Sequence, residues 1–588
     1  MTASWQASRS VGASAPRLRA RHECSADEHQ AVKTGSHSFV ALTPTTFLER
    51  SGAAFPNRTA LIHAGGSISY GSLLSRCRRL ARALSRAGVG PGDRVALLME
   101  NGIHTVEAHF AIPAVGGVVV MLNPWLSPAD LLDLVRFSAP AVLIADSGSF
   151  ARIAGMWSEL AEQAPRVVLS DHGQPMAGVD ALDYETILSA ETDTVMLDQA
   201  IGSELDTVAI NFTSGTTGRP KGVSYSHRAG YLHAIGQVLM LELSRASNYL
   251  WTLPMFHVSG WGHIWAGVAA GCTQVVLSGS TTQGREAEFV AAIERHRISH
   301  LAGSPRLLRG LVDAVDAAGA QSAVSGLTVE TGGAAPPTAL IRRLEELGVR
   351  LIHQYGLNET CGPFVVNEEQ DDWAALTPEQ RASLRARQGV AAIHAGTGVR
   401  VVDDNGREVP HDGRSLGEVV MAGNTLASGY YNNPEATAKA FRDGWFHSGD
   451  VAVVHPDGAL EIRDRMKDLI HVETDYGWEN ISSIEIENVL CRNPAIRDAA
   501  VIAAVPKADA DGRQRLVAYV ETIDPAFAEA DFHAYCAREL SVYKRPDTVF
   551  FEPLPKTSTG KVRKDVLVAD ASDRIGVTAA RNRDVEVV

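Results

Sequence analysis

The chain has 588 residues, more than a single hydrophobic core of about 250 to 300 residues can organise, so at least two domains are expected. Hydrophobic residues make up 45% of it and charged residues 21%, which is typical of globular proteins and excludes collagen-like, disordered and membrane classes. Because 68 acidic residues outnumber 54 basic ones for a net charge of -14, nucleic acid is not an expected partner, and an anionic ligand needs its own basic site.

The cysteines and the N-terminal segment indicate where the protein resides. Six cysteines are scattered without a CxxC pair, which argues against a disulfide framework and a structural zinc site and favours the reducing cytoplasm. Residues 1–40 are rich in Ser, Ala, Arg and His and lack an apolar segment, so a disordered extension is expected rather than a signal peptide. The most apolar stretch, residues 108–122, is too short to span a membrane.

Apolar segments alternate with helix-like stretches along the first part of the chain. From residue 42 to about 205 this alternation predicts a mainly parallel α/β sheet, and a second set follows to about residue 362. Residues 389–463 are rich in glycine with short apolar runs, which favours antiparallel strands.

The charge density rises at EIRDRMKDLIHVETDYG, around Asp464, which predicts a hinge before a small domain. The expected fold is α/β. A large N-terminal domain, residues 41–464, contains two α/β-layered subdomains and a small β-rich subdomain, and a smaller mobile α+β cap domain covers residues 465–572. Residues 573–588 are expected to be a flexible tail, and the oligomeric state stays open, with a homodimer as one alternative.

A loop rich in Ser, Thr and Gly, NFTSGTTGRPKGVSYSHR at residues 211–228, follows the apolar segment VAI. Its backbone N–H groups, its hydroxyls and the Lys221 ammonium suit a polyphosphate. It is not a Walker A loop, because Gly222 follows Lys221 where that motif requires Ser or Thr. Taken alone, the loop also fits a surface turn.

The chain resembles the adenylate-forming superfamily, which includes acyl-CoA synthetases, peptide-synthetase adenylation domains and firefly luciferase. The loop is similar to the phosphate-binding signature of that superfamily, and four further segments match in order. They are GGAAPP (332–337) with HQYGLNET (353–360) for adenine and a Tyr-Gly-x-x-Glu motif, GYYNNPEATAKAFRDGWFHSGD (429–450) for ribose, DRMKD (464–468) for the hinge, and PKTSTGKVRK (555–564) for a catalytic lysine. The resemblance covers residues 42 to about 570.

The resemblance implies an AMP-forming acid–thiol ligase. A carboxylate attacks the α-phosphorus of ATP and expels pyrophosphate, and the acyl-adenylate then passes its acyl group to coenzyme A. The acid is already ionised near neutral pH, so no general base is needed. Cations and hydrogen-bond donors are needed instead, because two anions must meet. ATP, Mg²⁺ and coenzyme A are therefore the expected ligands, with coenzyme A as the less secure acceptor.

The matched motifs imply site residues. The catalytic residues are Lys561, Glu359, Thr213 and Lys221, of which Glu359 and Thr213 hold Mg²⁺. The ATP-binding residues are Thr213, Ser214, Gly215, Thr216, Thr217, Gly218, Lys221, Gly333, Ala334, Ala335, Gln354, Tyr355, Gly356, Asp450 and Arg465. Lys467 is the hinge residue, about which the cap domain is expected to rotate between the two half-reactions. For each charged residue, a solvated or salt-bridged surface position is the alternative.

The chain departs from the family pattern after the hinge. Eight residues, HVETDYGW, separate Ile470 from Glu479 where relatives have four, and Trp478 replaces the second of two glycines that line the acceptor channel, Gly477 being the first. Either the indole blocks the pantetheine arm of coenzyme A or the longer loop moves it aside, so the acceptor stays open.

The acyl pocket is expected beside Gly332, Gly356 and a helix carrying His257, Trp261 and Trp265 at positions i, i+4 and i+8. Large rings would shorten the pocket and favour a small, branched or aromatic acid, although aromatic residues at this spacing also fit a plain core.

Three rivals remain at this point. The first is an adenylating enzyme that passes the acid, even a small inorganic one such as nitrite, to an amine, a carrier-protein thiol or another non-CoA acceptor. The second is an oxygenase of luciferase type, and the third is a nucleotide-binding protein without turnover.

Overall fold

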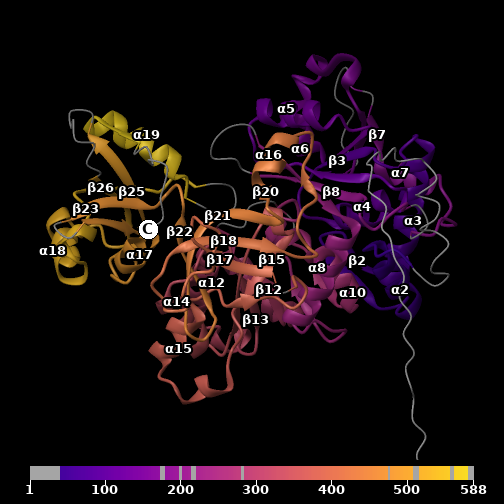
Figure 1. Ribbon diagram of the computed structural model, residues 1–588. Coiled ribbons are helices and arrows are strands. Elements are labelled where there is room, and N and C mark those ends of the chain that lie inside the picture. Colours follow the sequence, from indigo (N-terminus) through magenta and orange to yellow (C-terminus); the bar gives the residue numbers. More distant parts are fainter. Residues whose placement is uncertain are drawn as a thin grey trace, which may run out of the picture. The chain divides into compact units, whose positions relative to one another are not determined.

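The computed structural model describes residues 40–579 except for short segments at 172–178, 180, 198–200, 214–219, 278, 280–283, 397, 475–476, 507–514 and 557–561. The predicted N-terminal extension thus lies outside the described residues, apart from Val40. Figure 1 shows the described elements, which begin with α2 (Thr45–Ala54). All of them belong to one unit of the chain, residues 42–588.

Within the described residues, an eight-stranded sheet has the order β19-β9-β8-β4-β3-β5-β6-β7. Neighbouring strands from β8 to β7 are parallel, and β9 pairs antiparallel with β8 and β19. The strands are β3 (Arg94–Leu98), β4 (Val118–Met121), β5 (Val142–Ala145), β6 (Arg166–Leu169), β7 (Ala181–Asp183), β8 (Thr207–Phe212), β9 (Gly222–Ser226) and β19 (Gly429–Tyr430). Strands such as β4, VVVM, are apolar and buried throughout, as expected for parallel strands covered on both faces.

Helices cover both faces of this sheet. Alternate residues of a strand face opposite sides, so Val95 and Leu97 of β3 join one buried cluster while Ala96 and Leu98 join another. The first cluster includes α3 (Tyr70–Arg86) and α4 (Ile103–Ala114), and the second includes α5 (Pro128–Ser138) and α6 (Ser147–Ala154). The mainly parallel α/β arrangement predicted for this part of the chain is confirmed.

The second large sheet has nine strands in the described residues, in the order β16-β15-β14-β13-β12-β10-β11-β1-β2. Neighbours from β14 to β1 are parallel, and β2, β15 and β16 pair antiparallel at the edges. The strands are β1 (Thr59–His63), β2 (Gly66–Ser69), β10 (Asn248–Leu250), β11 (Thr273–Val275), β12 (His300–Ala302), β13 (Thr328–Thr331), β14 (Arg350–Leu357), β15 (Gly362–Val366) and β16 (Val390–Ala391).

The two large sheets share a layer of helices between them. Buried residues of α8 (His227–Met240) and α10 (His263–Ala270) belong to the same cluster as α3 and α4. On the far side of the second sheet, α11 (Glu286–His296), α12 (Pro305–Ala318) and α14 (Thr338–Glu346) form their own cluster with β10, β12 and β13. The resulting order, helices, sheet, helices, sheet and helices, can be followed in Figure 1.

A third, antiparallel sheet of five strands follows, as the glycine-rich pattern predicts. Its strands are β17 (Gly398–Val402), β18 (Gly417–Ala422), β20 (Phe441–Arg442), β21 (Trp445–Val454) and β22 (Leu460–Arg465). The shorter helices of this large region are α7 (Tyr184–Ser189), α9 (Val258–Trp261), α13 (Gln321–Val324), α15 (Pro378–Arg385) and α16 (Pro434–Ala440). Four 3-10 helices are η2 (Trp157–Gln163), η3 (Asn358–Thr360), η4 (Asp371–Ala375) and, near the C-terminus, η5 (Val542–Lys544).

The C-terminal region has its own α+β core. A hairpin of β23 (Ile470–Thr474) and β24 (Gly477–Ile481) precedes a four-stranded sheet of β25 (Ile496–Pro506), β26 (Arg515–Thr522), β27 (Thr548–Phe551) and β28 (Val577–Ala579). Buried residues of α17 (Ser483–Leu490) and α18 (Glu529–Glu539) form one cluster with this sheet, and α19 (Lys564–Ile575) forms another. The predicted fold class, with a separate α+β C-terminal domain, is confirmed.

The regular structure extends past residue 573, the predicted start of a flexible tail. Leu567 and Ala571 of α19 are buried against β25 and β26, and β28 pairs antiparallel with β25. The predicted boundary is therefore too early, because packing of α19 and pairing of β28 continue to Ala579.

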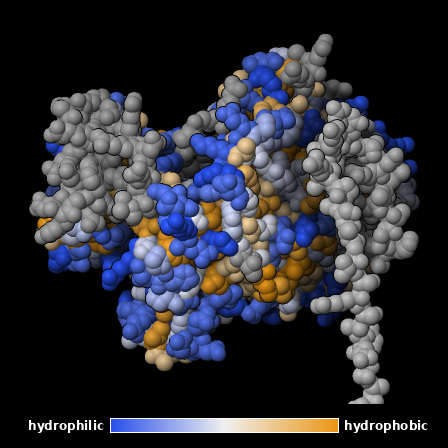
Figure 2. Space-filling model, viewed as in Figure 1, coloured by the Kyte–Doolittle hydropathy of each residue, from blue (hydrophilic) through white to orange (hydrophobic). Residues whose placement is uncertain are grey.

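The face of the molecule in Figure 2 is covered largely by hydrophilic side chains, with smaller hydrophobic areas between them. In the part of the chain that the structure describes, no helix combines the length and the apolar character needed to cross a bilayer.

Candidate active site

The predicted phosphate loop is closed at its base by one backbone–backbone and one backbone–side-chain hydrogen bond. β8 ends at Phe212, after which the Thr213 N–H donates to the Lys221 carbonyl at 3.0 Å and the Lys221 N–H donates to Thr213 Oγ1 at 3.3 Å. The predicted residues Ser214, Gly215, Thr216, Thr217 and Gly218 lie outside the described residues. Thr213 and Lys221, which flank them, are thereby held next to each other.

Lys221 and Glu359 meet at Tyr430. The Lys221 ammonium lies 4.7 Å from the centre of the Tyr430 ring, and the Tyr430 hydroxyl donates to Glu359 Oε1 at 2.7 Å. Burial, together with the Glu359 carboxylate, raises the pKa of Tyr430, which therefore stays protonated and acts as the donor. The structure thus joins two predicted site residues through a third that the sequence patterns did not single out, although it lies within the matched segment 429–450.

Asp450 and Arg465, the predicted ribose site, are paired across two strands. They are opposite each other in β21 and β22, and Arg465 Nε donates to Asp450 Oδ1 at 2.7 Å. The Tyr355 hydroxyl donates to Asp450 Oδ2 at 2.6 Å, and Asp450 is only 3% exposed. Burial lowers the pKa of Arg465 while the Asp450 carboxylate raises it, and the net direction is upward, so this guanidinium stays charged.

Tyr355, predicted to face adenine, is thus held at its tip by Asp450. The turn expected to contact adenine, Gly333, Ala334 and Ala335, comes directly after β13, and Gly333 has a φ of +80°. Gly332 packs so tightly on the Gln354 amide that a Cβ atom there would clash with it, which requires glycine at this position. Gly356 lies in β14, at the point where its register with β15 shifts.

The helix predicted to carry His257, Trp261 and Trp265 is in fact two helices, α9 and α10, separated at Gly262. The single-helix spacing is therefore wrong, because α9 ends after one turn. His257 caps α9 by accepting from the Ser259 N–H, and burial lowers its pKa to about 4, so its ring is neutral near pH 7.

Trp261 and Trp265 are completely buried. Trp261 stacks on Tyr225 with ring centres 4.9 Å apart and meets Trp265 edge to face at 4.6 Å. Both rings thus belong to the core between the two large sheets.

The hinge residue Lys467 is exposed and lies in the turn after β22, where the Asp468 and Leu469 N–H groups donate to the Arg465 carbonyl. Gly477 and Trp478 belong to β24, where they pair with Thr474 and Glu473 of β23. The backbone after the hinge is thus a β-hairpin, which accounts for the extra residues of this loop.

Lys561 lies outside the described residues, but half-buried lysines on both flanks of its segment are held by ion pairs. Lys556 Nζ lies 2.5 Å from Asp498 Oδ2 and 3.1 Å from Glu521 Oε1. On the other side, Lys564 Nζ lies 2.8 Å from Glu487 Oε1 and donates to Ser483 Oγ at 2.5 Å.

The Lys564 network continues to the hinge strand. Asp464, the residue before Arg465, accepts from both the Ser483 N–H at 2.7 Å and the Ser483 hydroxyl at 2.6 Å. A continuous set of hydrogen bonds therefore runs from the end of β22 to the start of α19. The charged strings around Asp464 and Lys564 were visible in the sequence, but not their pairing.

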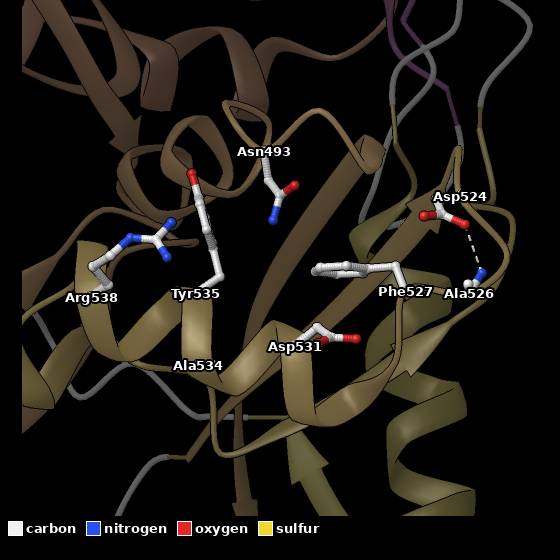
Figure 3. A pocket seen from close by; sticks show the side chains of 8 residues that line it. All are labelled: Asn493, Asp524, Ala526, Phe527, Asp531, Ala534, Tyr535 and Arg538. Atoms are coloured by element: carbon white, nitrogen blue, oxygen red, sulfur yellow. Dashed lines mark hydrogen bonds between the residues drawn. The ribbon is translucent and has the colours of Figure 1, made fainter.

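A surface depression on the C-terminal region lies apart from these residues. Figure 3 shows its lining, in which Asp524 Oδ1 accepts from the Ala526 N–H at 2.8 Å. The residues around it are Asn493, Asp524, Ala526, Phe527, Asp531, Ala534, Tyr535 and Arg538. None of the predicted site residues is among them.

Over the described ranges, no three or more His, Cys, Asp or Glu side chains gather in a way that could hold a metal ion. In nucleotide sites Mg²⁺ takes one or two carboxylates and completes its shell with phosphates and water. Glu359, fixed by Tyr430, and the Thr213 hydroxyl at the base of the phosphate loop fit that donor set.

A predicted phosphate loop, a lysine and a carboxylate that contact the same tyrosine, and an acidic–basic pair fit a nucleotide-using enzyme. The AMP-binding enzyme family matches residues 48–431, and the AMP-binding enzyme C-terminal domain matches residues 485–561. The chain therefore belongs to the AMP-binding enzyme family, and the resemblance found in the sequence is confirmed.

The relatives are acid–CoA ligases. The chain is 35% identical to a peroxisomal trans-cinnamate:CoA ligase of Petunia hybrida, over 90% of this chain and 93% of that protein. It is 36% identical to an acetate–CoA ligase of Humulus lupulus, over 91% and 96% of the two chains. A solved structure of o-succinylbenzoate CoA synthetase from Bacillus subtilis, in complex with ATP and a magnesium ion, has 25% identity and a TM-score of 0.71 and covers 88% of this chain and 98% of that one.

Proposed function

We propose that this protein is an AMP-forming acid–coenzyme A ligase, which activates a small carboxylic acid with ATP and transfers the acyl group to coenzyme A. The observation that supports the proposal is the joining of Lys221 to Glu359 through Tyr430, since a cation and a carboxylate suited to Mg²⁺ then share one side chain near the base of the proposed phosphate loop. The Tyr355–Asp450–Arg465 cluster supplies the matching ribose site.

In the first half-reaction, an oxygen of the acid attacks the α-phosphorus, a P–O bond forms, and the bond to pyrophosphate breaks. Lys221 offsets charge on the phosphates, and Lys561 is proposed to bridge the acid and the α-phosphate where negative charge grows. Glu359 and Thr213 would hold Mg²⁺, which neutralises phosphate charge when bound. Asp450 can accept from the ribose hydroxyls, and Arg465 pairs with its carboxylate.

In the second half-reaction, the sulfur of coenzyme A attacks the acyl carbon and AMP leaves. We propose that the cap domain, from about residue 465 onward, turns about Lys467 to exchange Lys561 for the acceptor channel at Gly477 and Trp478. The hairpin of β23 and β24 supports a channel wall formed by backbone, since strand pairing fixes the position of this segment.

The acid is proposed to be small, branched or aromatic. Because Trp261 and Trp265 are buried in the core, they would close the acyl pocket beyond His257, Gly332 and Gly356 at a fixed depth. The cytoplasm is the proposed location, because the cysteines of the described residues are all free, although the Petunia relative is peroxisomal.

A pyrophosphate-release screen over carboxylic acids, each run with and without coenzyme A, tests the proposal. We expect ATP- and acid-dependent pyrophosphate and, with coenzyme A, an acyl-CoA detected by mass spectrometry. Pyrophosphate without any thioester would instead identify a non-CoA acceptor, oxygen uptake would identify an oxygenase, and ATP binding without pyrophosphate would refute catalysis.

A lysine pair sharpens the test. Lys561→Ala is expected to lower the adenylation rate by at least about 100-fold while ATP binding changes little, because its charge acts on the transition state. Lys439→Ala is the matched control, since Lys439 is an exposed lysine of α16. Equal rates for the two variants would contradict the role of Lys561.

A further inference from the structure

A carboxylate is buried directly behind the turn that follows β13. Glu330 is 2% exposed and precedes Gly332 by two residues. Since residues two apart in an extended segment face the same side, Glu330 faces the same side as the bare backbone of Gly332. The strand therefore directs an acidic side chain toward the predicted acyl pocket, in a region where an apolar residue would suffice for packing alone.

Two side chains hold this carboxylate. His263 Nε2 lies 2.7 Å from Glu330 Oε2, and Gln237 Nε2 donates to Glu330 Oε1 at 3.2 Å. His263 is the first residue of α10, and Gln237 lies in α8. The carboxylate also fixes the orientation of the Gln237 amide, because the reverse orientation would turn an oxygen toward an oxygen.

Three buried polar atoms around this group have no hydrogen-bond partner within the described residues. They are Gln237 Oε1, Tyr249 Oη and His233 Nδ1. The residues that carry them are each no more than 2% exposed. A buried polar atom without a partner destabilises the fold, so three together are not expected in a site that is complete by itself.

His233 is built tightly into the same place. A Cβ atom at Gly262 would overlap its Nε2 edge, so the turn between α9 and α10 is shaped to admit the imidazole. Burial, with His394 and His263 nearby, lowers the pKa of His233, so the ring is neutral and can accept as well as donate.

From this cluster we infer that the acid activated here carries a hydrogen-bond-donating group, a hydroxyl or an amino group, at the end remote from its carboxylate, and that Gln237, Glu330 and His263 select it. The inference rests on the proposed function. Gln237 Oε1 can only accept, and it therefore needs a donor from the ligand. The hydroxyl of Tyr249 can pair with the same group as donor or as acceptor.

The test uses non-hydrolysable acyl-sulfamoyl adenosines, which mimic the acyl-adenylate and whose binding does not depend on turnover. Matched sets are butanoyl, 4-hydroxybutanoyl and 4-aminobutanoyl, and benzoyl with its hydroxy and amino derivatives. Dissociation constants come from isothermal titration calorimetry. We expect at least one donor-bearing analogue to bind about tenfold or more tightly than its parent, because a site built for a donor rejects the analogue that lacks it.

Gln237→Leu and Glu330→Leu are expected to reduce this preference to less than threefold, whereas Glu330→Gln, which keeps an acceptor oxygen, retains part of it. The hydroxy and amino arms identify which donor is used. Equal or tighter binding of every parent analogue to the natural protein would overturn the inference and leave the ligase proposal standing, with ordered water pairing the three atoms. Failure of ATP and of every analogue to bind would overturn both the inference and the ligase proposal. The comparison of analogues on the natural protein is sufficient by itself, so a variant that does not fold does not invalidate the test.

Discussion

Removal of one hydroxyl group, in Tyr430→Phe, tests how the proposed phosphate loop is coupled to Glu359, the carboxylate proposed to hold Mg²⁺. The phenylalanine ring keeps the face over which Lys221 lies and loses only the donor to Glu359 Oε1, a bond of 2.7 Å. Hydrogen bonds to a charged group contribute about 1.5–3 kcal/mol, which corresponds to roughly 10- to 100-fold in rate. We therefore expect kcat/KM for ATP in the pyrophosphate assay to fall within that range.

The same change is expected to raise the concentration of Mg²⁺ that gives half-maximal rate, because Glu359 loses the contact that holds it in place. Tyr430→Leu removes the ring as well, and the loss of the contact with Lys221 is expected to cost about a further 0.5–1 kcal/mol. A titration of Mg²⁺ at saturating ATP measures the first effect, and a titration of ATP measures the second.

The neighbouring tyrosine is the matched control. Tyr431 packs edge to face on Phe137 with ring centres 5.7 Å apart, so Tyr431→Phe should leave both titrations unchanged. If Tyr430→Phe behaves like Tyr431→Phe, with kcat/KM and the Mg²⁺ requirement within twofold of the natural protein, then Tyr430 does not position Glu359 and the reasoning is wrong.

Three further predictions concern other parts of the molecule. Asp450→Asn should raise KM for ATP at least about tenfold with little change in KM for the acid, and similar changes in both would contradict a ribose site. Lys564→Met should slow adenylation in a single-turnover assay, because the Lys564 ammonium anchors the segment before α19. Lys564→Arg should largely keep the adenylation rate of the natural protein. An unchanged rate in the Met variant would exclude this role. Burial lowers the pKa of His109, His227 and His353 to about 4. Between pH 6.5 and pH 4 the unfolded chain therefore binds protons at these histidines that the folded chain does not. The free energy of unfolding should fall over this range by up to about 1.4 kcal/mol per pH unit for each histidine. Denaturation midpoints at pH 7.5 and 5.5 measure this, and a midpoint that rises on acidification would contradict it.

The layered fold could be predicted because its signals are local. Parallel strands covered on both faces must be apolar throughout, and short runs such as VVVM in β4 therefore stand out from the helical stretches around them. The β-rich subdomain has an equally local signal in its glycine-rich turns. The end of the structure could not be placed, because β28 is held by pairing with β25, a contact between segments far apart in the chain.

The candidate site, too, could be predicted only where its residues have a local sequence signal. Motif strings pointed to Glu359, Lys221 and Asp450 but not to the groups that join them, such as Tyr430, since a tyrosine beside a second tyrosine carries no local signal. The prediction of one helix from the spacing of His257, Trp261 and Trp265 was wrong, because α9 ends just before Gly262 after a single turn and α10 begins a new helix.

Charge decides how the parts of the site must act together. ATP is a polyanion, and the protein carries a net charge of -14, so the cations that face the nucleotide have to be local. Asp450 already offsets Arg465, whereas the neighbour described for Lys221 is an aromatic ring, which holds an ammonium without neutralising it. The positive charge of Lys221 is thus left for the phosphates, but one ammonium cannot balance a triphosphate and an incoming carboxylate. We therefore propose that a second cation arrives with the acid, and the sequence between Lys556 and Lys564 contains the candidate, Lys561.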